Sequence, residues 1–199
     1  MLTIYGSTTS PFVRRVRIVA ADLKLEHKLF DSVPESGQAA MRKLNPLWKV
    51  PTIEWRGGVV FDSHVIVETL WHEFGGGSLR PYDANDVEER NTLSVIDGAL
   101  DSAVNVFYMK KDGVDITKVP YLVKQRERVD SAMTWLNERL RDGWFTSQPQ
   151  FGYAELVAFT TFEWFRFREV VQVERWPRLA SFTDAHHQRF FDTRPMVTA

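Results

Sequence analysis

The character of this amino-acid sequence changes near residue 75, and that change limits the possible folds more than any other feature. Before it, segments with strand-like alternation and segments with helical periodicity follow one another. After it, the sequence is helical almost to its end. The stretch GGGSLRPYDAND at 75–86 combines glycines, a proline and polar residues, which is typical of a linker. We therefore predict a small α/β domain over 1–76, a linker over 77–86 and an all-α domain over 87–199.

The first part of the chain predicts the order β-α-β-α-β-β-α. The predicted strands are short and alternating or β-branched: 2–5, 27–31, 52–55 and 59–61. The predicted helices repeat apolar residues every three or four positions: 11–23, 36–44 and 63–74. The strand–helix–strand start implies a parallel pair, and the last two strands form an antiparallel hairpin around Arg-Gly-Gly. Beyond the linker, the same periodicity predicts helices over 87–109, 120–140, 153–171 and 177–191.

Composition excludes several classes of function. The chain carries 25 Lys and Arg against 26 Asp and Glu, whereas a nucleic-acid binder usually has a basic footprint. No apolar run reaches the ~18–20 residues of a membrane span. The first residues lack the basic and apolar regions of a signal peptide. We therefore expect a soluble, cytoplasmic protein without nucleic-acid or membrane partners.

The chain contains no cysteine, so it offers no disulfide, no cysteine-ligated metal site and no protein thiol as a nucleophile. Its histidines include no His-x-x-x-His pair, the spacing that a helical metal site uses. Gly-x-Ser-x-Gly, Gly-x-Gly-x-x-Gly and phosphate-binding-loop motifs are absent from the sequence. We therefore expect neither a metal nor a bound cofactor.

The segment NPLWKVPTI places a proline directly before a predicted strand. Because proline cannot donate to a sheet, Pro51 is either a simple strand-start residue or a cis-proline that turns the chain sharply. In the second case, the backbone N–H and carbonyl of Val50 would point out of the sheet and could pair with an extended peptide. The pattern alone leaves both interpretations open.

The pair Asp62-Ser63 falls at a strand end and opens a predicted helix. Both residue types are preferred helix N-caps, so a purely structural role is one interpretation. The unpaired N–H groups and the positive dipole of the helix start could instead hold a carboxylate, with Asp62 holding an amine beside it. The amino-acid end of a ligand would match both groups.

The segment STTSPFVRRVR has Ser10 at a predicted N-cap and Pro11 at the first helical position. Arg14, Arg15 and Arg17 follow close to the positive end of the helix dipole, where cations are slightly disfavoured. Ser10 therefore either only caps the helix or contributes its hydroxyl to a site where an anion offsets the arginine charge.

Taken together, these features resemble the cytosolic glutathione transferase family along the whole chain. The resemblance is carried by TSPFVRRVRIVAADLKLE, NPLWKVPTIEWRGGVVFDSHVIVETL and RWPRLASFTDAHHQRFFDTRP. It implies a thioredoxin-like domain followed by an all-α domain, with the cis-proline loop at Val50-Pro51 and the acidic–serine pair at Asp62-Ser63. In the subgroup with Ser-Pro-Phe at the first helix, the serine is the active residue, and that position is Ser10 here.

The resemblance also implies a function. Glutathione would be the co-substrate, and Ser10 or Thr9 would stabilise its thiolate for attack on a small, mostly apolar electrophile. Some classes of the family use a tyrosine at the end of the first strand, which leaves Tyr5 as a third candidate. The alternatives are a non-catalytic binding or regulatory protein and a glutathione-dependent peroxidase or isomerase.

The same resemblance assigns the binding residues. Val50 would pair with the cysteinyl backbone of glutathione, and Lys49 could meet the glycyl carboxylate. The residues implied in glutathione binding are Phe12, Lys49, Val50, Pro51, Asp62 and Ser63. The electrophile would bind between the domains, and each residue of its expected wall could equally be a core residue: Phe107, Tyr108, Met109 and Trp164.

Two further expectations concern the helical domain. The family usually forms homodimers, and the small residues Gly98 and Ala99 would permit close approach of a partner helix. The family's Ser/Thr-x-x-Asp capping box is replaced here by Gly152-Tyr153-Ala154-Glu155. Because glycine is a tolerable cap and Glu155 can still reach back, we expect this helix start to survive.

Overall fold

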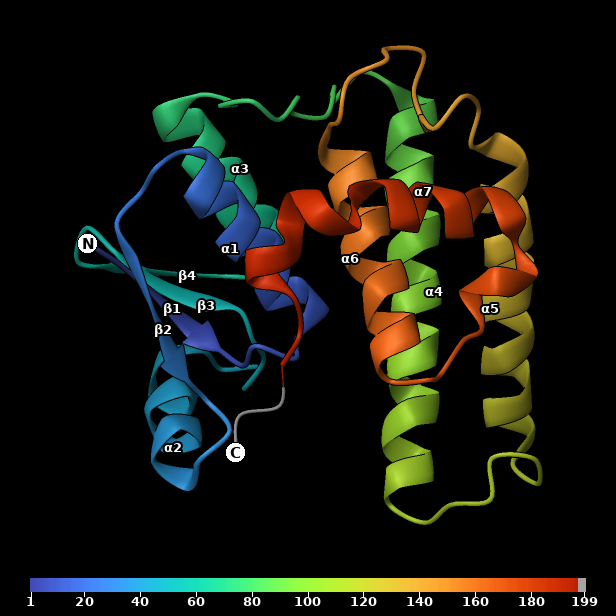
Figure 1. Ribbon diagram of the computed structural model, residues 1–199. Helices are drawn as coiled ribbons and strands as arrows, with labels where there is room; N and C mark the ends of the chain where they lie inside the picture. Colours follow the sequence, from blue (N-terminus) through green and yellow to red (C-terminus); the bar gives the residue numbers. More distant parts are fainter. Residues whose placement is uncertain (197–199) are drawn as a thin grey trace. The chain divides into compact units, whose positions relative to one another are not determined.

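The computed structural model describes residues 1–196 and divides into two compact units (Figure 1). The first unit contains Met1–Pro81 and, of the described residues, Arg189–Met196, and the second contains Tyr82–Gln188. The first boundary falls inside the predicted linker. The end of the chain differs from the sequence-based division, which placed all of 87–199 in the helical domain. It packs with the first unit because arginines of that unit bond its backbone.

The first unit has the predicted order of elements: β1 (Leu2–Gly6), α1 (Pro11–Asp22), β2 (His27–Asp31), α2 (Glu35–Leu44), β3 (Thr52–Trp55), β4 (Gly58–Phe61) and α3 (Ser63–Phe74). The strand order in the sheet is β2-β1-β3-β4. β1 runs parallel to β2, with Ile4 opposite Leu29, and β3 runs antiparallel to β1 and β4. The predicted parallel pair and hairpin are confirmed, and the topology is thioredoxin-like.

The core of this unit is formed by β1, α1 and α3. Its fully buried apolar side chains include Leu2, Ile4, Val13, Val16, Val19, Ile66 and Leu70. Gly6 permits close packing of α1 on the end of β1, because a Cβ there would lie 2.3 Å from Cγ2 of Val13. This contact fixes the start of α1, and with it the loop Ser7–Ser10, beside the end of the sheet.

The second unit consists of helices: α4 (Val87–Lys111), α5 (Pro120–Arg139), α6 (Tyr153–Phe167), the short η1 (Val173–Arg175) and α7 (Pro177–His187). α4 packs against both α5 and α6. Every residue of α6 from Tyr153 to Phe165 is buried, so α6 is the core helix of this unit. The expected start of α6 is also observed. The buried carboxylate of Glu155 accepts from the Gly152 N–H at 3.0 Å and from the Phe145 N–H at 2.9 Å.

Two helices end earlier than their apolar patterns predicted. The prediction for α6 extended to residue 171, but the chain leaves the helix near Glu169, whose φ is 52°. The prediction for α7 extended to residue 191, but α7 ends at His187 and is followed by η2 (Gln188–Thr193), which is non-helical at Phe190. After α6, apolar packing continues beyond the end of the helix, as the fully buried Val173 shows, whereas η2 contains no buried residue.

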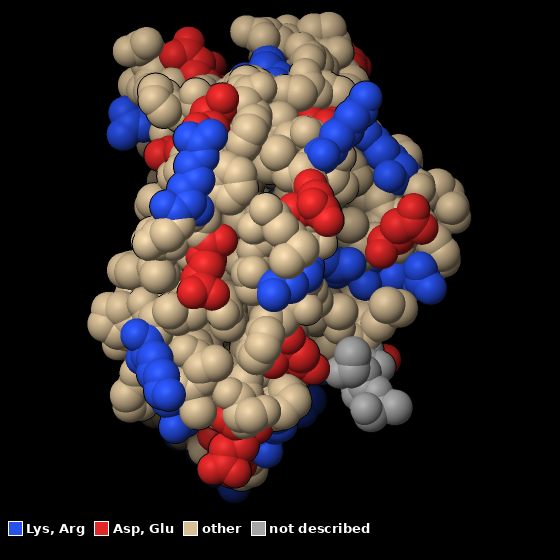
Figure 2. All heavy atoms as spheres, turned by 90° about the vertical axis from the view of Figure 1, so that its left-hand side faces the viewer, with Lys and Arg blue, Asp and Glu red and all other residues tan. Residues whose placement is uncertain are grey.

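The surface in Figure 2 carries charges of both signs, with Lys and Arg lying among Asp and Glu. No helix within residues 1–196 combines the length and the apolar composition needed to cross a bilayer. Among the same residues, no group of three His, Asp or Glu side chains is placed to hold a metal ion.

Candidate functional site

The loop between β1 and α1 carries four hydroxyl side chains, and each has a defined partner. Ser10 has φ −82° and ψ 126°, and its Oγ accepts from the Val13 N–H at 3.3 Å, so it is the N-cap of α1. The Ser7 and Thr9 hydroxyls bond each other at 3.0 Å. The Thr8 hydroxyl donates to the carbonyl of Met196 at 2.5 Å.

The cap at Ser10 does not exclude a chemical role. A hydroxyl has one donor hydrogen and two acceptor lone pairs, and the bond from Val13 uses only an acceptor position. The hydroxyl proton therefore remains available to a ligand atom beside the helix start. The two interpretations of Ser10 that the sequence left open are compatible in this geometry.

Tyr5 lies in β1, and its environment does not favour a role in activating a thiol. Its hydroxyl donates to Oε2 of Glu54 at 2.5 Å, and its ring lies 4.9 Å from that of Phe30. The hydrogen bond to Glu54, together with burial and the charge of Glu54, raises the pKa of Tyr5 to about 12. Its proton is thus directed to a carboxylate on β3, which leaves Ser10 and Thr9 as the hydroxyl candidates.

The loop before β3 contains a cis peptide bond between Val50 and Pro51, as the second interpretation of NPLWKVPTI expected. Asn45 braces this loop: its buried side chain donates to the Lys49 carbonyl at 2.8 Å and to the Thr52 hydroxyl at 3.0 Å. Within residues 1–196, no backbone-to-backbone hydrogen bond outside the regular elements uses Val50. The Val50 backbone thus lies next to the sheet without being part of it.

Asn45 is not among the site residues that the sequence predicted. Its bracing role depends on the fold, because it joins the end of α2 to the start of β3 across the cis-proline loop. Its Oδ1 also accepts from the Leu47 N–H at 2.9 Å, which is the local turn geometry that asparagine favours. Lys49 projects from the same loop as an exposed residue.

The start of α3 is capped by Asp62, whose Oδ1 accepts from the His64 N–H at 2.8 Å and from the Val65 N–H at 3.3 Å. Asp62 has φ 74°, an unusual conformation for a residue other than glycine. Ser63 is buried, and its Oγ lies 3.4 Å from Nη1 of Arg15. The capping interpretation of this pair is therefore observed, and the exposed Asp62 remains accessible at the helix start.

The arginines of α1 have partners within the protein. Arg15 is fully buried and its guanidinium lies 4.9 Å from the ring centre of the half-buried Phe12. Arg14, also buried, donates to the carbonyl of Phe190 at 3.2 Å. Partners within the protein thus account for the positions of Arg14 and Arg15, and no bound anion is needed to explain them.

The helical unit brings three of the four expected electrophile-binding residues together. The ring of Phe107 on α4 lies 5.7 Å from Trp164 on α6 and 5.2 Å from Tyr108. Trp164 is buried, whereas Tyr108 is 52% exposed and Met109 is 39% exposed. Of the small residues expected at a dimer contact, Gly98 is exposed on α4, but Ala99 is buried within this chain.

The fold and this arrangement of loops define a class of protein: a thioredoxin-like domain with a cis-proline loop, followed by a helical domain. The family model "Glutathione S-transferase, N-terminal domain" matches residues 9–73. The model "Glutathione S-transferase, C-terminal domain" matches residues 87–185. The chain belongs to the glutathione S-transferase family.

Individual relatives are distant but match along most of the chain. A probable glutathione S-transferase of Nicotiana tabacum is 23% identical over 191 residues, which cover 92% of this chain and 82% of the relative. Glutathione S-transferase D7 of Drosophila melanogaster is 26% identical over 192 residues, covering 88% of this chain and 82% of that protein.

Solved structures of bacterial family members are also similar. A glutathione S-transferase of Methylobacterium radiotolerans in complex with glutathione sulfonate has a TM-score of 0.85 and 27% identity, covering 100% of this chain and 96% of that one. A family member of Pseudomonas fluorescens with bound glutathione has a TM-score of 0.82 and 26% identity, covering 99% of this chain and 100% of that one.

Proposed function

We propose that this protein is a glutathione transferase that activates the thiol of glutathione for attack on small, mostly apolar electrophiles. The observation that carries the proposal is the geometry of Ser10, which caps α1 as an acceptor and keeps its hydroxyl proton for a ligand. Bacterial relatives that cover nearly the whole chain hold glutathione or glutathione sulfonate, which supports the same ligand here.

Glutathione is a tripeptide with one thiol, one amine and two carboxylates, and the first unit has a group for each. The backbone of Val50, next to Pro51, pairs with the cysteinyl residue as an added strand would. Because Asp62 already accepts from the His64 and Val65 N–H groups, the N–H and hydroxyl of Ser63 receive the γ-glutamyl carboxylate, and Asp62 receives the neighbouring ammonium. The exposed Lys49 meets the glycyl carboxylate.

The chemical step requires a thiolate. A thiol of pKa ~8.5 is only a few per cent ionised near pH 7. The N-terminus of α1 and a hydrogen bond from Ser10 favour the charged form, and each unit by which the pKa falls corresponds to about 1.4 kcal/mol. The thiolate then attacks an electrophilic carbon and a C–S bond forms. In a substitution the leaving group departs with the electron pair of the bond that breaks, and in an addition to an α,β-unsaturated carbonyl compound the π electrons of the C=C bond move towards the carbonyl group and the resulting enolate takes a proton from water.

The electrophile is bound by the aromatic cluster of the helical unit. Phe107 and Trp164 form an edge-to-face pair, and Tyr108 adds a ring that is half exposed. Such rings bind apolar, flat molecules through buried area, and a positive charge lies beside them, because the Arg168 guanidinium is 5.1 Å from the Phe107 ring centre. Met109 on the same helix adds a flexible apolar side chain. The proposal therefore favours aromatic or otherwise apolar electrophiles over cationic ones.

Glutathione binding is tested by thermal unfolding with and without reduced glutathione. A ligand at 100 times its Kd adds about 2.7 kcal/mol to the stability of the folded state. Asp62→Asn removes the negative charge but keeps a side-chain oxygen that can cap α3, so this variant should fold normally and lose most of the gain. The matched control is Asp86→Asn, because Asp86 caps α4 through the same two kinds of bond.

The outcomes separate the candidate functions. An unchanged melting temperature at saturating glutathione would remove the proposed function. Binding followed by conjugation of halogenated aromatic or α,β-unsaturated compounds would support the transferase. Binding without turnover on such a panel would favour a non-catalytic binding protein, and turnover of peroxides alone would favour the peroxidase.

A further inference from the structure

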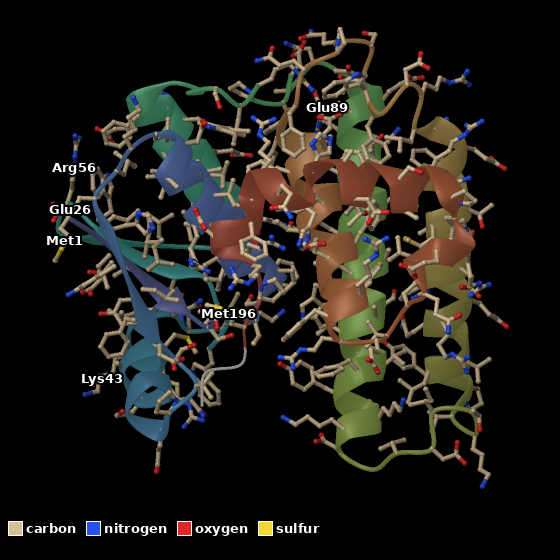
Figure 3. All side chains as sticks on the ribbon, in the orientation of Figure 1. Met1, Glu26, Lys43, Arg56, Glu89 and Met196 are labelled. Atoms are coloured by element: carbon tan, nitrogen blue, oxygen red, sulfur yellow. The ribbon has the colours of Figure 1, made fainter. Side chains whose placement is uncertain are left out.

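The end of the chain is attached to α1 through arginine side chains. Arg14 is 2% exposed, and its guanidinium donates to the Phe190 carbonyl at 3.2 Å and to the Thr193 hydroxyl at 3.3 Å. Arg17, one turn later, donates to the Thr193 carbonyl at 3.5 Å, and burial lowers its pKa. These bonds lie within the first unit and hold the segment Arg189–Met196, here called the tail, against α1 (Figure 3).

The tail has a second attachment point in the hydroxyl loop. The Thr8 hydroxyl donates to the carbonyl of Met196 at 2.5 Å. Thr8 stands between Ser7 and Thr9, whose hydroxyls bond each other, and the Ser10 N–H donates to the Ser7 carbonyl at 3.2 Å. A shift of Thr8 therefore also shifts its neighbours Ser7 and Thr9, and with them the turn that orients Ser10.

The two attachments differ in kind. The planar guanidinium of Arg14 makes two bonds with fixed relative direction, which a lysine or an apolar residue cannot reproduce. The bond from Thr8 is a single contact to the last described residue of the tail. The first attachment fixes where the tail crosses α1, and the second ties the hydroxyl loop to the tail.

We propose that the tail is a strap, held by Arg14, that fixes the loop Ser7–Ser10, and that Arg14 is thereby a positioning residue for activation of the thiol. The predicted effect on the thiol rests on the proposed function. The attachment of the tail to the loop does not, because it is a property of the protein without glutathione. A hydrogen bond to a sulfur anion weakens steeply as its geometry worsens, so a looser loop raises the pKa of the bound thiol.

Three variants test the strap. Thr8→Val removes the bond between loop and tail without changing α1, and Arg14→Met removes the bonds from Arg14 to Phe190 and Thr193. Thr69→Val is the matched control, because the Thr69 hydroxyl donates to the carbonyl of Val65 within α3 of the same unit. If Arg14→Met fails to fold, Thr8→Val still decides the outcome, since its side chain is not part of the core.

The first measurement is amide hydrogen exchange of the unliganded proteins. Thr8→Val and Arg14→Met should raise exchange in the hydroxyl loop, while Thr69→Val should leave it as in the wild type. Unchanged exchange in the first two variants would overturn the strap. This result does not depend on glutathione, so it separates failure of the strap from failure of the proposed function.

The second measurement is the ultraviolet titration of bound glutathione, with the pH–rate profile beside it. For Thr8→Val and Arg14→Met, we expect the thiol pKa to rise by about half a unit to one unit, and kcat near pH 7 to fall about 3- to 10-fold. KM should change less than twofold, and kcat should recover at high pH. A wild-type thiol pKa together with faster loop exchange would overturn the positioning role of Arg14.

Discussion

At the scale of single residues, Ser10 shows that a capping role and a chemical role can belong to one hydroxyl. The distance from the Val13 N–H to its Oγ is 3.3 Å, slightly longer than the usual range for such bonds. The cap bond is therefore weak, and little stability depends on it. Tyr5 is the opposite case: its short bond to Glu54 directs its proton away from any ligand and raises its pKa to about 12.

The contrast leads to a prediction about Ser10→Gly. Because glycine is an acceptable N-cap, folding stability should fall by only a few tenths of a kcal/mol. The bound thiol should lose a charged hydrogen bond worth ~1.5–3 kcal/mol, so conjugation near pH 7 should fall roughly ten- to a hundredfold and return in part at high pH. The titration of bound glutathione measures the thiol pKa directly.

Tyr5→Phe serves as the comparison, and it should leave the thiol pKa and the rate unchanged. If Ser10→Gly keeps both as in the wild type, the role moves to Thr9, and the same titration of Thr9→Val tests that assignment.

At the scale of elements, the buried helix α6 depends on its first turn. Glu155 satisfies two backbone N–H groups, those of Gly152 and Phe145, with one carboxylate that is fully buried. Gly152 is the N-cap residue and has no side chain that could accept a hydrogen bond. The side-chain bonds observed at this helix start therefore come from Glu155. The same carboxylate fixes the loop before α6 to the helix, so one residue holds two segments.

We predict that Glu155→Ala destabilises the protein by about 2–4 kcal/mol, because the buried N–H of Gly152 and the partly buried N–H of Phe145 lose a charged acceptor. The free energy of unfolding, measured by urea denaturation, should fall by this amount. The exposed Glu138 on α5 provides the control, and Glu138→Ala should change stability by less than about 0.5 kcal/mol. Equal effects of the two substitutions would contradict the importance of this helix start.

At the scale of the whole molecule, the chain is divided into two units, and its end returns to the first. In the sequence, the helical unit thus lies between α3 and the tail. The first unit is therefore built from two segments that are not consecutive in the chain. The complete absence of cysteine is a second property of the whole chain, since it limits the reactions available to any site on it.

From this absence we predict negligible turnover in thiol–disulfide exchange through a protein mixed disulfide. Such a reaction requires a protein thiolate to attack the disulfide, and this chain has none. The measurement is the reduction of a glutathionylated peptide in the presence of glutathione, compared with the rate without protein. A clear acceleration over that rate would mean that the site acts on disulfides by another route.

The order of elements and the parallel and antiparallel strand pairs could be predicted because they depend on local patterns. Alternation, helical periodicity and cap residues are properties of neighbouring positions, and they placed α3 at its observed bounds. The candidate positions Ser10, Val50-Pro51 and Asp62-Ser63 were found in the same way, since each is a short motif at an element boundary. The end of α6 was missed because apolar residues pack in loops as well as in helices, and the end of α7 was missed because Phe190 and Phe191 continue the apolar pattern without being buried.

Only the tertiary structure decided which side chains meet. Tyr5 and Glu54 are 49 positions apart, Arg15 and Ser63 are 48 apart, and Arg14 and Thr193 are 179 apart. No local pattern encodes such pairs, because they depend on how the sheet, α1 and the returning tail pack against one another. The sequence therefore determined that arginines follow Ser10 on α1, and the fold determined that Arg14 binds the end of the chain.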